Sequence, residues 1–410
     1  MKRSLVGRGM RFPFVLITFF FFLWGFARAV LDILNPFFQQ ALDLSKTQAA
    51  GIQFVTYVAY FMMAVPAGRF IRRYGTRRGV LLGLILFGLG AMGFSLGGLG
   101  TSATAAFGIL LVMLFMSGCG LATLEVAANP YVTLLGDPLT AAGRLNRAQA
   151  FNGAGCIGGS LLGGIYCFGA PRADVSVPYL IIGGVVLAVA VVFSRIRLPE
   201  VIMAEASGEA VSTGGLRRQH MFMFGLGALF CYEIAEIAIN SFFVNYAVES
   251  DWVGWAVRML PGVSGHLVAA MALSVGLLLF MGGRLLGSWV MQYVAAERVL
   301  LFCASCAVAL TVVVMMDWPV VSFAASWLIF VVESIMFPTI FALSIRGLGP
   351  LTQRGSAILM MTPVGGAVGT VLMGMAADLS GMTWAFVVPL AAYVVVLAYA
   401  LALQRSKAQS

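Results

Sequence analysis

Charged residues are scarce in this chain: they make up 10% of its 410 residues, whereas hydrophobic residues make up 61%. Soluble globular domains usually contain about 25% charged residues, so the composition excludes a soluble globular protein. It is typical instead of a polytopic membrane protein, because about 20 apolar residues in a helix cross a bilayer core. Twelve such spans are predicted, at 12–36, 48–71, 79–99, 104–132, 145–168, 176–196, 221–248, 265–291, 299–316, 319–345, 355–377 and 383–403.

Side chains that carry out enzyme chemistry are also few. The only histidines are His220 and His266, and both lie near the ends of spans. All six cysteines lie within spans, and the Cys303–Cys306 pair has no second pair with which to form a metal site. The sequence has no arrangement of metal ligands and no nucleophile with a base. We therefore predict no enzyme activity, no metal site and no cofactor.

Long hydrophilic segments are absent, apart from the stretch at 197–220. Because it separates six spans from six, we predict an N-terminal six-helix bundle at 1–196, a cytoplasmic linker at 197–220 and a C-terminal six-helix bundle at 221–410. The linker is too short for the soluble output domain of a sensor. A cleavable signal peptide is not expected, because the first apolar stretch is much longer than the core of about 7–15 residues in such a peptide.

The two halves resemble each other weakly. Glu125 and Pro130 in the fourth span recur at the same spacing as Glu333 and Pro338 in the tenth. Glycines cluster in the fifth and eleventh spans, which predicts close helix packing there, with a rocking contact as the alternative. Parallel six-helix halves, each of two three-helix repeats, are the architecture of major facilitator transporters. We therefore predict an all-α fold of this type, with two pseudo-symmetric halves and a site between them.

The formal net charge of +9 is placed as membrane topology requires. The predicted outer loops hold only Lys46, Arg172 and Arg258, whereas the segment 68–79 alone holds five arginines. Because cytoplasmic loops carry the excess of Lys and Arg, we expect both termini in the cytoplasm. The predicted location is the bacterial cytoplasmic (inner) membrane, and the expected surroundings are lipid, without nucleic acid.

Polar side chains inside the apolar segments recur at every third span. A charge at the centre of a membrane helix costs at least about 2.5–3.5 kcal/mol, so it normally faces a protein interior or a watery cavity. The recurrence indicates that the first helices of the three-helix repeats line one cavity, as in a transporter. These residues are Arg28 and Asp32 in the first span, Glu125 and Asn129 in the fourth, Glu233, Glu236 and Asn240 in the seventh, and Glu333 in the tenth.

Asp32 and Glu125 are the candidates for carrying protons. Arg28 and Asp32 are four residues apart and share a helix face; a self-neutralising pair that only tightens packing is the alternative. Glu125 has no cation within one helical turn and is predicted to lie nearer the cytoplasm than Asp32. It can take up and release a proton as its exposure changes, unless it serves only as a satisfied hydrogen-bonding group.

Carboxamides are the main candidates for substrate binding. Gln149 and Asn152 lie on one face of the fifth span, and carboxamides offer the paired donors and acceptors that suit sugar hydroxyls. Ordinary hydrogen bonding between helices is the alternative. The roles of Glu233 and Glu333 stay open. The predicted substrate-binding residues are Arg28, Asn129, Gln149, Asn152, Glu236, Asn240 and Phe337.

Several of these segments resemble the fucose permease family, the fucose–galactose–glucose:proton symporters of the major facilitator superfamily. The likeness runs through essentially all twelve spans and includes LWGFARAVLDILNP, LEVAANP, AQAFNG and FPTIFALSIRGLG. It implies proton-coupled uptake of a monosaccharide. It also implies that Asp32 and Glu125 stand at the positions of carboxylates tied to protonation, and that Gln149 and Asn152 match substrate-facing amides.

The chain departs from the fucose permeases at the predicted pocket, so the resemblance does not specify fucose as the sugar. Arg28 and Leu31 stand where that family carries asparagines, Glu236 where it carries glutamine, Asn240 where it carries tryptophan, and Phe337 where it carries tyrosine.

The combined expectation is a monomeric, proton-coupled symporter that imports a hexose, a deoxyhexose or an amino sugar by alternating access. A sodium-coupled sugar carrier or an exporter of small molecules on the same fold is the alternative. Sodium needs several converging oxygens, which Asp32, Asn35 and a backbone carbonyl could supply. A transport-inactive sensor fits less well, because the linker has no room for an output domain.

Overall fold

The computed structural model of the protein describes residues 6, 10–41, 46–95, 103–169, 176–195, 214–217, 219–259 and 265–409. This part of the chain is helical and contains no β-strand. Eight stretches of it are long and apolar enough to cross a membrane, and Arg11–Phe26 and Leu180–Arg195 are shorter apolar helical stretches.

Each of the six spans predicted in the N-terminal half coincides with one helix. The third helix begins three residues before its predicted start, because Gly75, with a φ of 87°, ends the preceding helix and turns the chain. Glycine takes this left-handed conformation without a steric penalty. The helices are α1 (Arg11–Ala41), α2 (Lys46–Tyr74), α3 (Thr76–Gly93), α4 (Ala103–Leu134), α5 (Ala141–Gly169) and α6 (Ser176–Arg195), with the 3₁₀ turn η2 (Pro138–Thr140) before α5.

In the C-terminal half, three predicted spans are single helices and three are divided. The single helices are α8 (His220–Glu249), α10 (Gly265–Val290) and α11 (Ala296–Met315). The divided spans are α12 (Pro319–Glu333) with α13 (Met336–Ser344), α14 (Thr352–Leu359) with α15 (Val364–Ser380), and α16 (Met382–Ala385) with α17 (Val387–Gln409). Three short elements were not predicted: α7 (Gly214–Arg217), α9 (Asp251–Met259) and the 3₁₀ turn η3 (Gly349–Leu351).

Two prolines at matching positions leave backbone carbonyls without a helical donor. Pro338, the third residue of α13, cannot donate to the Ser334 carbonyl and its ring crowds that carbonyl, so the tenth span divides there. Pro130 has the same relation to the Val126 carbonyl, although α4 continues through it. Buried carbonyls need other donors, and both find one on another helix.

Glycines set the closest helix contacts in both halves. A Cβ atom on Gly155 would lie 2.0 Å from the carbonyl oxygen of Phe22, so α5 packs directly against the backbone of α1. A Cβ atom on Gly369 would lie 2.3 Å from the carbonyl oxygen of Ile234, so α15 packs against α8 in the same way. Close packing is therefore confirmed at these glycines of the fifth and eleventh spans.

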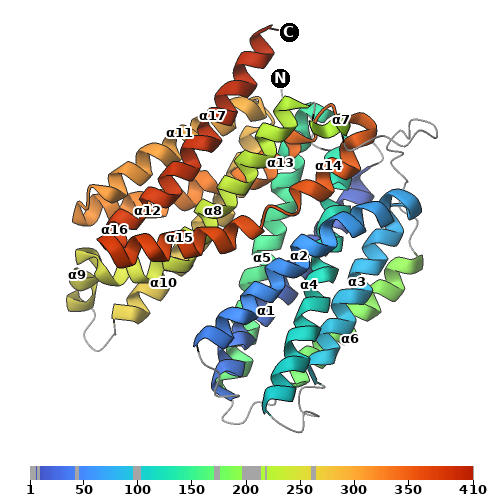
Figure 1. Cartoon of the computed structure of the whole chain (residues 1–410), viewed down its shortest axis with the longest axis horizontal. Coiled ribbons are helices and arrows are strands. Elements are labelled where there is room, and N and C mark those ends of the chain that lie inside the picture. Colours follow the sequence, from blue (N-terminus) through green and yellow to red (C-terminus); the bar gives the residue numbers. More distant parts are fainter. Residues whose placement is uncertain are drawn as a thin grey trace.

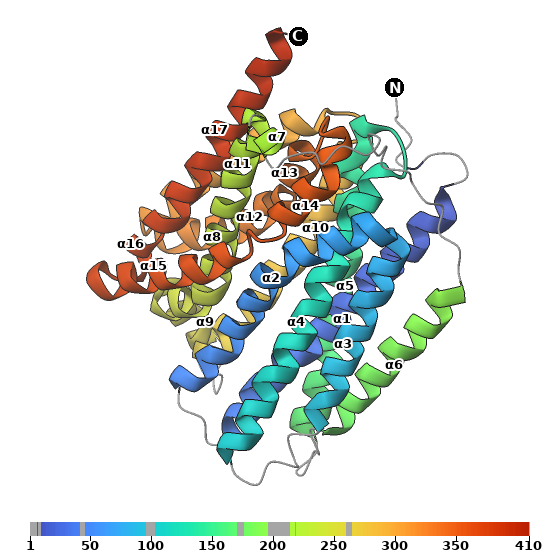
Figure 2. The same ribbon diagram turned by 45° about the vertical axis from the view of Figure 1, so that its right-hand side comes forward.

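The helices form two bundles that meet at one end of the molecule. In Figures 1 and 2, α1–α6 lie on one side and α8–α17 on the other, and the bundles diverge away from the end where both chain termini lie. We call the end with both termini the closed end. Contacts between the bundles join α5 to α10 and α13, and α14 to α2 and α4.

Candidate functional site

Glu125 is buried in the N-terminal bundle and has a hydrogen-bond donor on a neighbouring helix. The Tyr60 hydroxyl of α2 donates to Glu125 Oε1 over 2.8 Å. The exposed fractions of Tyr60 and Glu125 are 5% and 6%. A tyrosine hydroxyl can donate and accept, so it can serve Glu125 in either the ionised or the protonated form. The sequence did not predict this partner, because it lies on another helix.

A chain of polar contacts leads from the N-terminal to the C-terminal bundle. Gln149 Nε2 on α5 donates to Asn129 Oδ1 on α4 over 3.3 Å. Asn129 Nδ2 in turn faces the sulfur of Met360, 3.4 Å away at the end of α14. Arg284 Nη1 on α10 donates to the backbone carbonyl of Gln149 over 3.2 Å. Two predicted substrate-binding amides are thus brought together at the contact between the bundles.

Asn152, another predicted substrate-binding residue, has its amide nitrogen engaged within the N-terminal bundle. Asn152 Nδ2 donates to the backbone carbonyl of Phe21 on α1 over 3.0 Å. Among the described residues, the contact of its Oδ1 is a weak one, at 4.0 Å, with the Cys156 sulfur. The side chain is partly exposed. Its amide oxygen is therefore the atom with remaining capacity to accept a hydrogen bond from a ligand.

The C-terminal bundle contains a cluster of acidic and phenolic side chains from three helices, three of them buried and one partly exposed. Tyr393 on α17 donates a hydrogen bond from its hydroxyl to Glu333 Oε2. Glu236 on α8 is partly exposed and lies close enough to Glu333 to interact with it electrostatically. Tyr232, also on α8, lies close enough to both carboxylates to interact with them electrostatically, although its hydroxyl has no hydrogen-bond partner in the described part of the chain. We call Tyr232, Glu236, Glu333 and Tyr393 the C-terminal acidic cluster.

Phe337 and Asn240 each follow an acidic member of this cluster by four residues, Glu333 and Glu236 respectively. The Phe337 ring is nearly buried, and its centroid lies 6.4 Å from that of Tyr232. Asn240, one helical turn beyond Glu236, is partly exposed, and its Oδ1 is buried with no hydrogen-bond partner in the described part of the chain. Glu233 is 5% exposed. Arg28 and Asp32 belong to α1, but their side chains lie outside the described residues.

Arg284 is a candidate site residue that the sequence analysis did not name. Its guanidinium is nearly buried, and its Nε donates to the Ser334 carbonyl over 3.0 Å. This is the carbonyl that Pro338 leaves without a helical donor. A cation in the middle of an apolar stretch is a strong signal of function, and that signal was available in GLLLFMGGRLLGSW.

The closed end is sealed by hydrogen bonds from polar side chains to groups on the opposite bundle. Ser288 Oγ on α10 donates to the Gly143 carbonyl over 2.8 Å. Asn146 Nδ2 donates to Thr339 Oγ1 over 3.1 Å. Gln353 Nε2 donates over 3.3 Å to the Val126 carbonyl, the one left without a helical donor by Pro130. Uncharged groups make these links, so breaking them exposes no unpaired charge.

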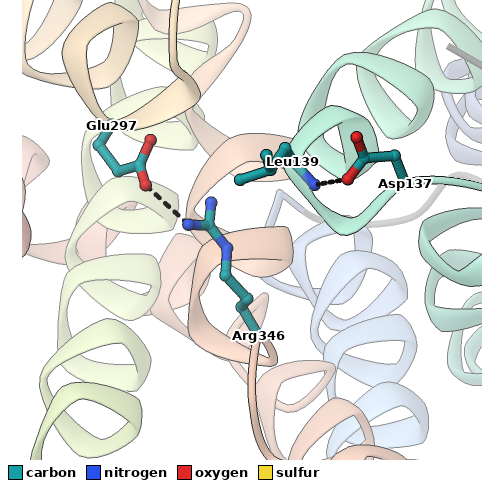
Figure 3. Close-up of polar contacts among 4 residues, drawn as sticks. All are labelled: Asp137, Leu139, Glu297 and Arg346. Atoms are coloured by element: carbon teal, nitrogen blue, oxygen red, sulfur yellow. Dashed lines mark hydrogen bonds and ion pairs between the residues drawn. The ribbon is translucent and has the colours of Figure 1, made fainter. Parts of the chain in front are cut away.

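An ion pair at the closed end stays within the C-terminal bundle. Arg346 Nη1, just after α13, lies 2.7 Å from Glu297 Oε1 in the first turn of α11 (Figure 3). The position of Glu297 also suits the positive end of the helix dipole. In the same view, Asp137 Oδ1 accepts from the Leu139 amide over 2.9 Å and caps η2 (Figure 3). Both contacts shape the closed end without crossing between the bundles.

A separate apolar pocket lies inside the N-terminal bundle. It is lined by α1, α3, α4 and α6, with Phe21, Leu84, Phe87 and Val186 among its walls. Trp24 also lines this pocket, and its indole nitrogen has no hydrogen-bond partner in the described part of the chain. None of the predicted site residues lines this pocket, so it belongs to the packing of the bundle.

Comparison with known proteins places the chain in a family. Residues 17–358 match the Major Facilitator Superfamily, and the chain belongs to this family. It is 32% identical over 398 residues to a glucose/galactose transporter of Brucella abortus biovar 1 (strain 9-941), covering 95% of this chain and 93% of that relative. It is 32% identical over 397 residues to the L-fucose-proton symporter of Escherichia coli (strain K12), covering 90% of this chain and 87% of that relative.

The fold agrees with these relatives. The crystal structure of FucP, a Major Facilitator Superfamily transporter in the outward conformation, matches with a TM-score of 0.83 and 31% identity, over 95% of this chain and 98% of that chain. The predicted twelve-helix major facilitator fold and the predicted resemblance to the fucose permease family are both confirmed.

Proposed function

We propose that the protein is a proton-coupled symporter that imports a monosaccharide by alternating access. The substrate class is a hexose, a deoxyhexose or an amino sugar. The observation that carries the proposal is the buried Glu125 with its Tyr60 donor. A carboxylate held in this way inside a membrane protein is suited to taking up and releasing a proton. Its setting supports this role, because relatives of the chain are a glucose/galactose transporter and an L-fucose-proton symporter.

In this proposal Asp32 and Glu125 carry protons, and the residues that contact the sugar are Arg28, Asn129, Gln149, Asn152, Glu236, Asn240 and Phe337. The contacts of Asn129 support its part in the set. Its amide nitrogen faces the thioether of Met360, which is a weak acceptor. A sugar hydroxyl would be a stronger hydrogen-bond acceptor for this amide than the thioether is. Replacing the thioether by a sugar hydroxyl would therefore favour binding.

The conformation we propose is outward-facing, with the closed end in the cytoplasm. The hydrogen bonds between the bundles lie at the closed end, and FucP in the outward conformation has a similar structure. The two moving bodies would be 1–196 and 221–410, joined by the linker at 197–220. The protein would act as a monomer in the bacterial cytoplasmic membrane, without cofactor or enzyme activity.

Counterflow in proteoliposomes tests the substrate class. The purified protein is reconstituted with one unlabelled monosaccharide inside, and entry of the same radiolabelled sugar is followed across a panel of hexoses, deoxyhexoses and amino sugars. We expect transient accumulation of at least one of them and none in liposomes without protein. If no monosaccharide shows counterflow while the protein remains folded, the proposed substrate class is wrong.

A further inference from the structure

Glu333 is fully buried, and no carboxylate in the described part of the chain is less exposed. It ends α12, at the break that Pro338 imposes on the tenth span. Its Oε2 accepts from the Tyr393 hydroxyl, while its Oε1 has no hydrogen-bond partner among the described residues. The Tyr232 hydroxyl in the same cluster is also fully buried and has no partner there. Two unsatisfied polar atoms thus share one buried cluster.

Charged and titratable groups face Glu333 from three helices. Glu236 and Tyr232 lie on α8, Arg284 on α10 and Tyr393 on α17. The guanidinium of Arg284 is directed to two backbone carbonyls, those of Ser334 and Gln149. No ion pair reaches Glu333 within the described part of the chain. The α13 segment that continues the span has no titratable side chain.

These surroundings do not satisfy an ionised carboxylate. Burying an isolated ionised carboxylate is very unfavourable, and such a group normally becomes neutral instead. Two neighbouring carboxylates cannot both stay ionised cheaply. Glu236 is partly exposed, whereas Glu333 is fully buried. Because charge costs more at the buried position, the proton belongs on Glu333. A proton on Oε1, the oxygen that has no hydrogen-bond partner among the described residues, also removes the need to bury a negative charge there.

We propose that Glu333 is a second proton-binding carboxylate of the transport cycle, located in the C-terminal bundle and coupled to sugar binding through Glu236. This inference rests on the proposed sugar–proton symport. Glu333 and Glu125 stand at matching positions, each five residues before a proline and each accepting a hydrogen bond from a tyrosine. The two bundles therefore each carry one buried Glu–Tyr pair.

Arg284 links the proton on Glu333 to the movement of the bundles. Its Nη1 bond to Gln149 crosses between the bundles, whereas its Nε bond holds it beside Ser334, the neighbour of Glu333. When the closed end opens, the bond to Gln149 breaks and the guanidinium is free to turn toward Glu333. The O–H bond of Glu333 then breaks, the proton leaves to water on the newly opened side, and Arg284 compensates the carboxylate charge.

Infrared spectroscopy of the purified, reconstituted protein tests this inference. The carbonyl band of protonated carboxylic acids is recorded over a pH series, and then with and without the sugar found by counterflow, for wild type and Glu333→Gln. We expect one component of the band to be absent in Glu333→Gln and to decrease when sugar binds to the wild type. Tyr393→Phe should keep that component but move its frequency, because it loses one hydrogen bond. Glu297→Gln is the matched control, since Glu297 is buried but ion-paired, and it should leave the band unchanged.

An identical band in wild type and folded Glu333→Gln would mean that Glu333 is ionised, and the inference would be wrong. A Glu333 component that does not respond to sugar would make it a permanently neutral structural acid, which also contradicts the proposal. The pH series needs no sugar. The proton on Glu333 can therefore be judged even if counterflow refutes monosaccharide transport.

Discussion

The hydroxyl of Tyr60 lies 2.8 Å from Glu125 Oε1, inside the bundle and away from solvent. Tyr393 and Glu333 repeat this relationship in the other bundle. Glu333 has no ion pair in the described part of the chain, whereas Arg346 fixes the charge of Glu297. A hydroxyl partner allows the carboxyl group to change its protonation state while it keeps a hydrogen bond. This property separates a proton carrier from a structural ion pair.

Glu125→Gln should keep exchange of sugar across the membrane and lose accumulation against a gradient. Glutamine resembles the protonated acid in shape and can still accept from Tyr60, but it cannot release a proton. Counterflow and proton-driven uptake are measured in the same proteoliposomes. Accumulation at the wild-type level would show that Glu125 is only structural.

Ser288→Ala should weaken the closed end and shift the protein toward the inward-facing state. Loss of the bond to the Gly143 carbonyl removes about 1 kcal/mol, which corresponds to a roughly five-fold change in the population ratio. Distances between spin labels on the two bundles measure the ratio of outward-facing to inward-facing molecules. Ser305→Ala is the matched control, because Ser305 Oγ bonds to Leu301 within its own helix. An equal effect of both variants would contradict the proposed seal.

Arg284→Lys should slow sugar exchange roughly ten-fold to a hundred-fold. Lysine lacks the planar fork that reaches the Ser334 and Gln149 carbonyls together, and a lost hydrogen bond to a charged group is worth about 1.5–3 kcal/mol. Arg298→Lys, on α11, is the control. The rates of counterflow are compared between the two folded variants and the wild type. An unchanged rate in Arg284→Lys would refute a role in transport for the hydrogen bonds of Arg284 to the Ser334 and Gln149 carbonyls.

Gly155→Ala should destabilise the N-terminal bundle by about 1–3 kcal/mol, because overpacking forces the helices apart. The new Cβ would meet the Phe22 carbonyl at 2.0 Å. Gly227→Ala on α8 meets nothing within 4 Å and should be neutral or slightly stabilising, since alanine favours helices. Thermal unfolding in detergent compares the two. Equal midpoints would contradict the close approach of α1 and α5.

The helices could be predicted from the sequence, because the lipid bilayer demands long apolar stretches whatever their neighbours. The sequence analysis did not predict the break in the tenth span, although Pro338 lies within that span. A proline inside a membrane span does not by itself divide a helix, as Pro130 in the continuous α4 demonstrates. In both spans a side chain from another helix takes up the freed carbonyl, Arg284 for Ser334 and Gln353 for Val126, and the sequence alone does not show these contacts.

The carboxylates of the candidate site could be predicted, but not their partners. Glu125 and Glu333 stand out because charge is rare in apolar spans. Tyr60 and Tyr393 lie 65 and 60 residues from them in sequence, and tyrosine in a membrane helix is unremarkable by itself. Only the packing of the helices brings each pair together. Arg284 differs, because its charge was a visible signal.

Sugar uptake into proteoliposomes under an imposed inward proton gradient, in sodium-free buffer, tests the central claim most directly. The account predicts accumulation of the monosaccharide above equilibrium, and a protonophore should abolish this accumulation while counterflow continues. Accumulation that survives the protonophore and follows a sodium gradient instead would contradict proton coupling.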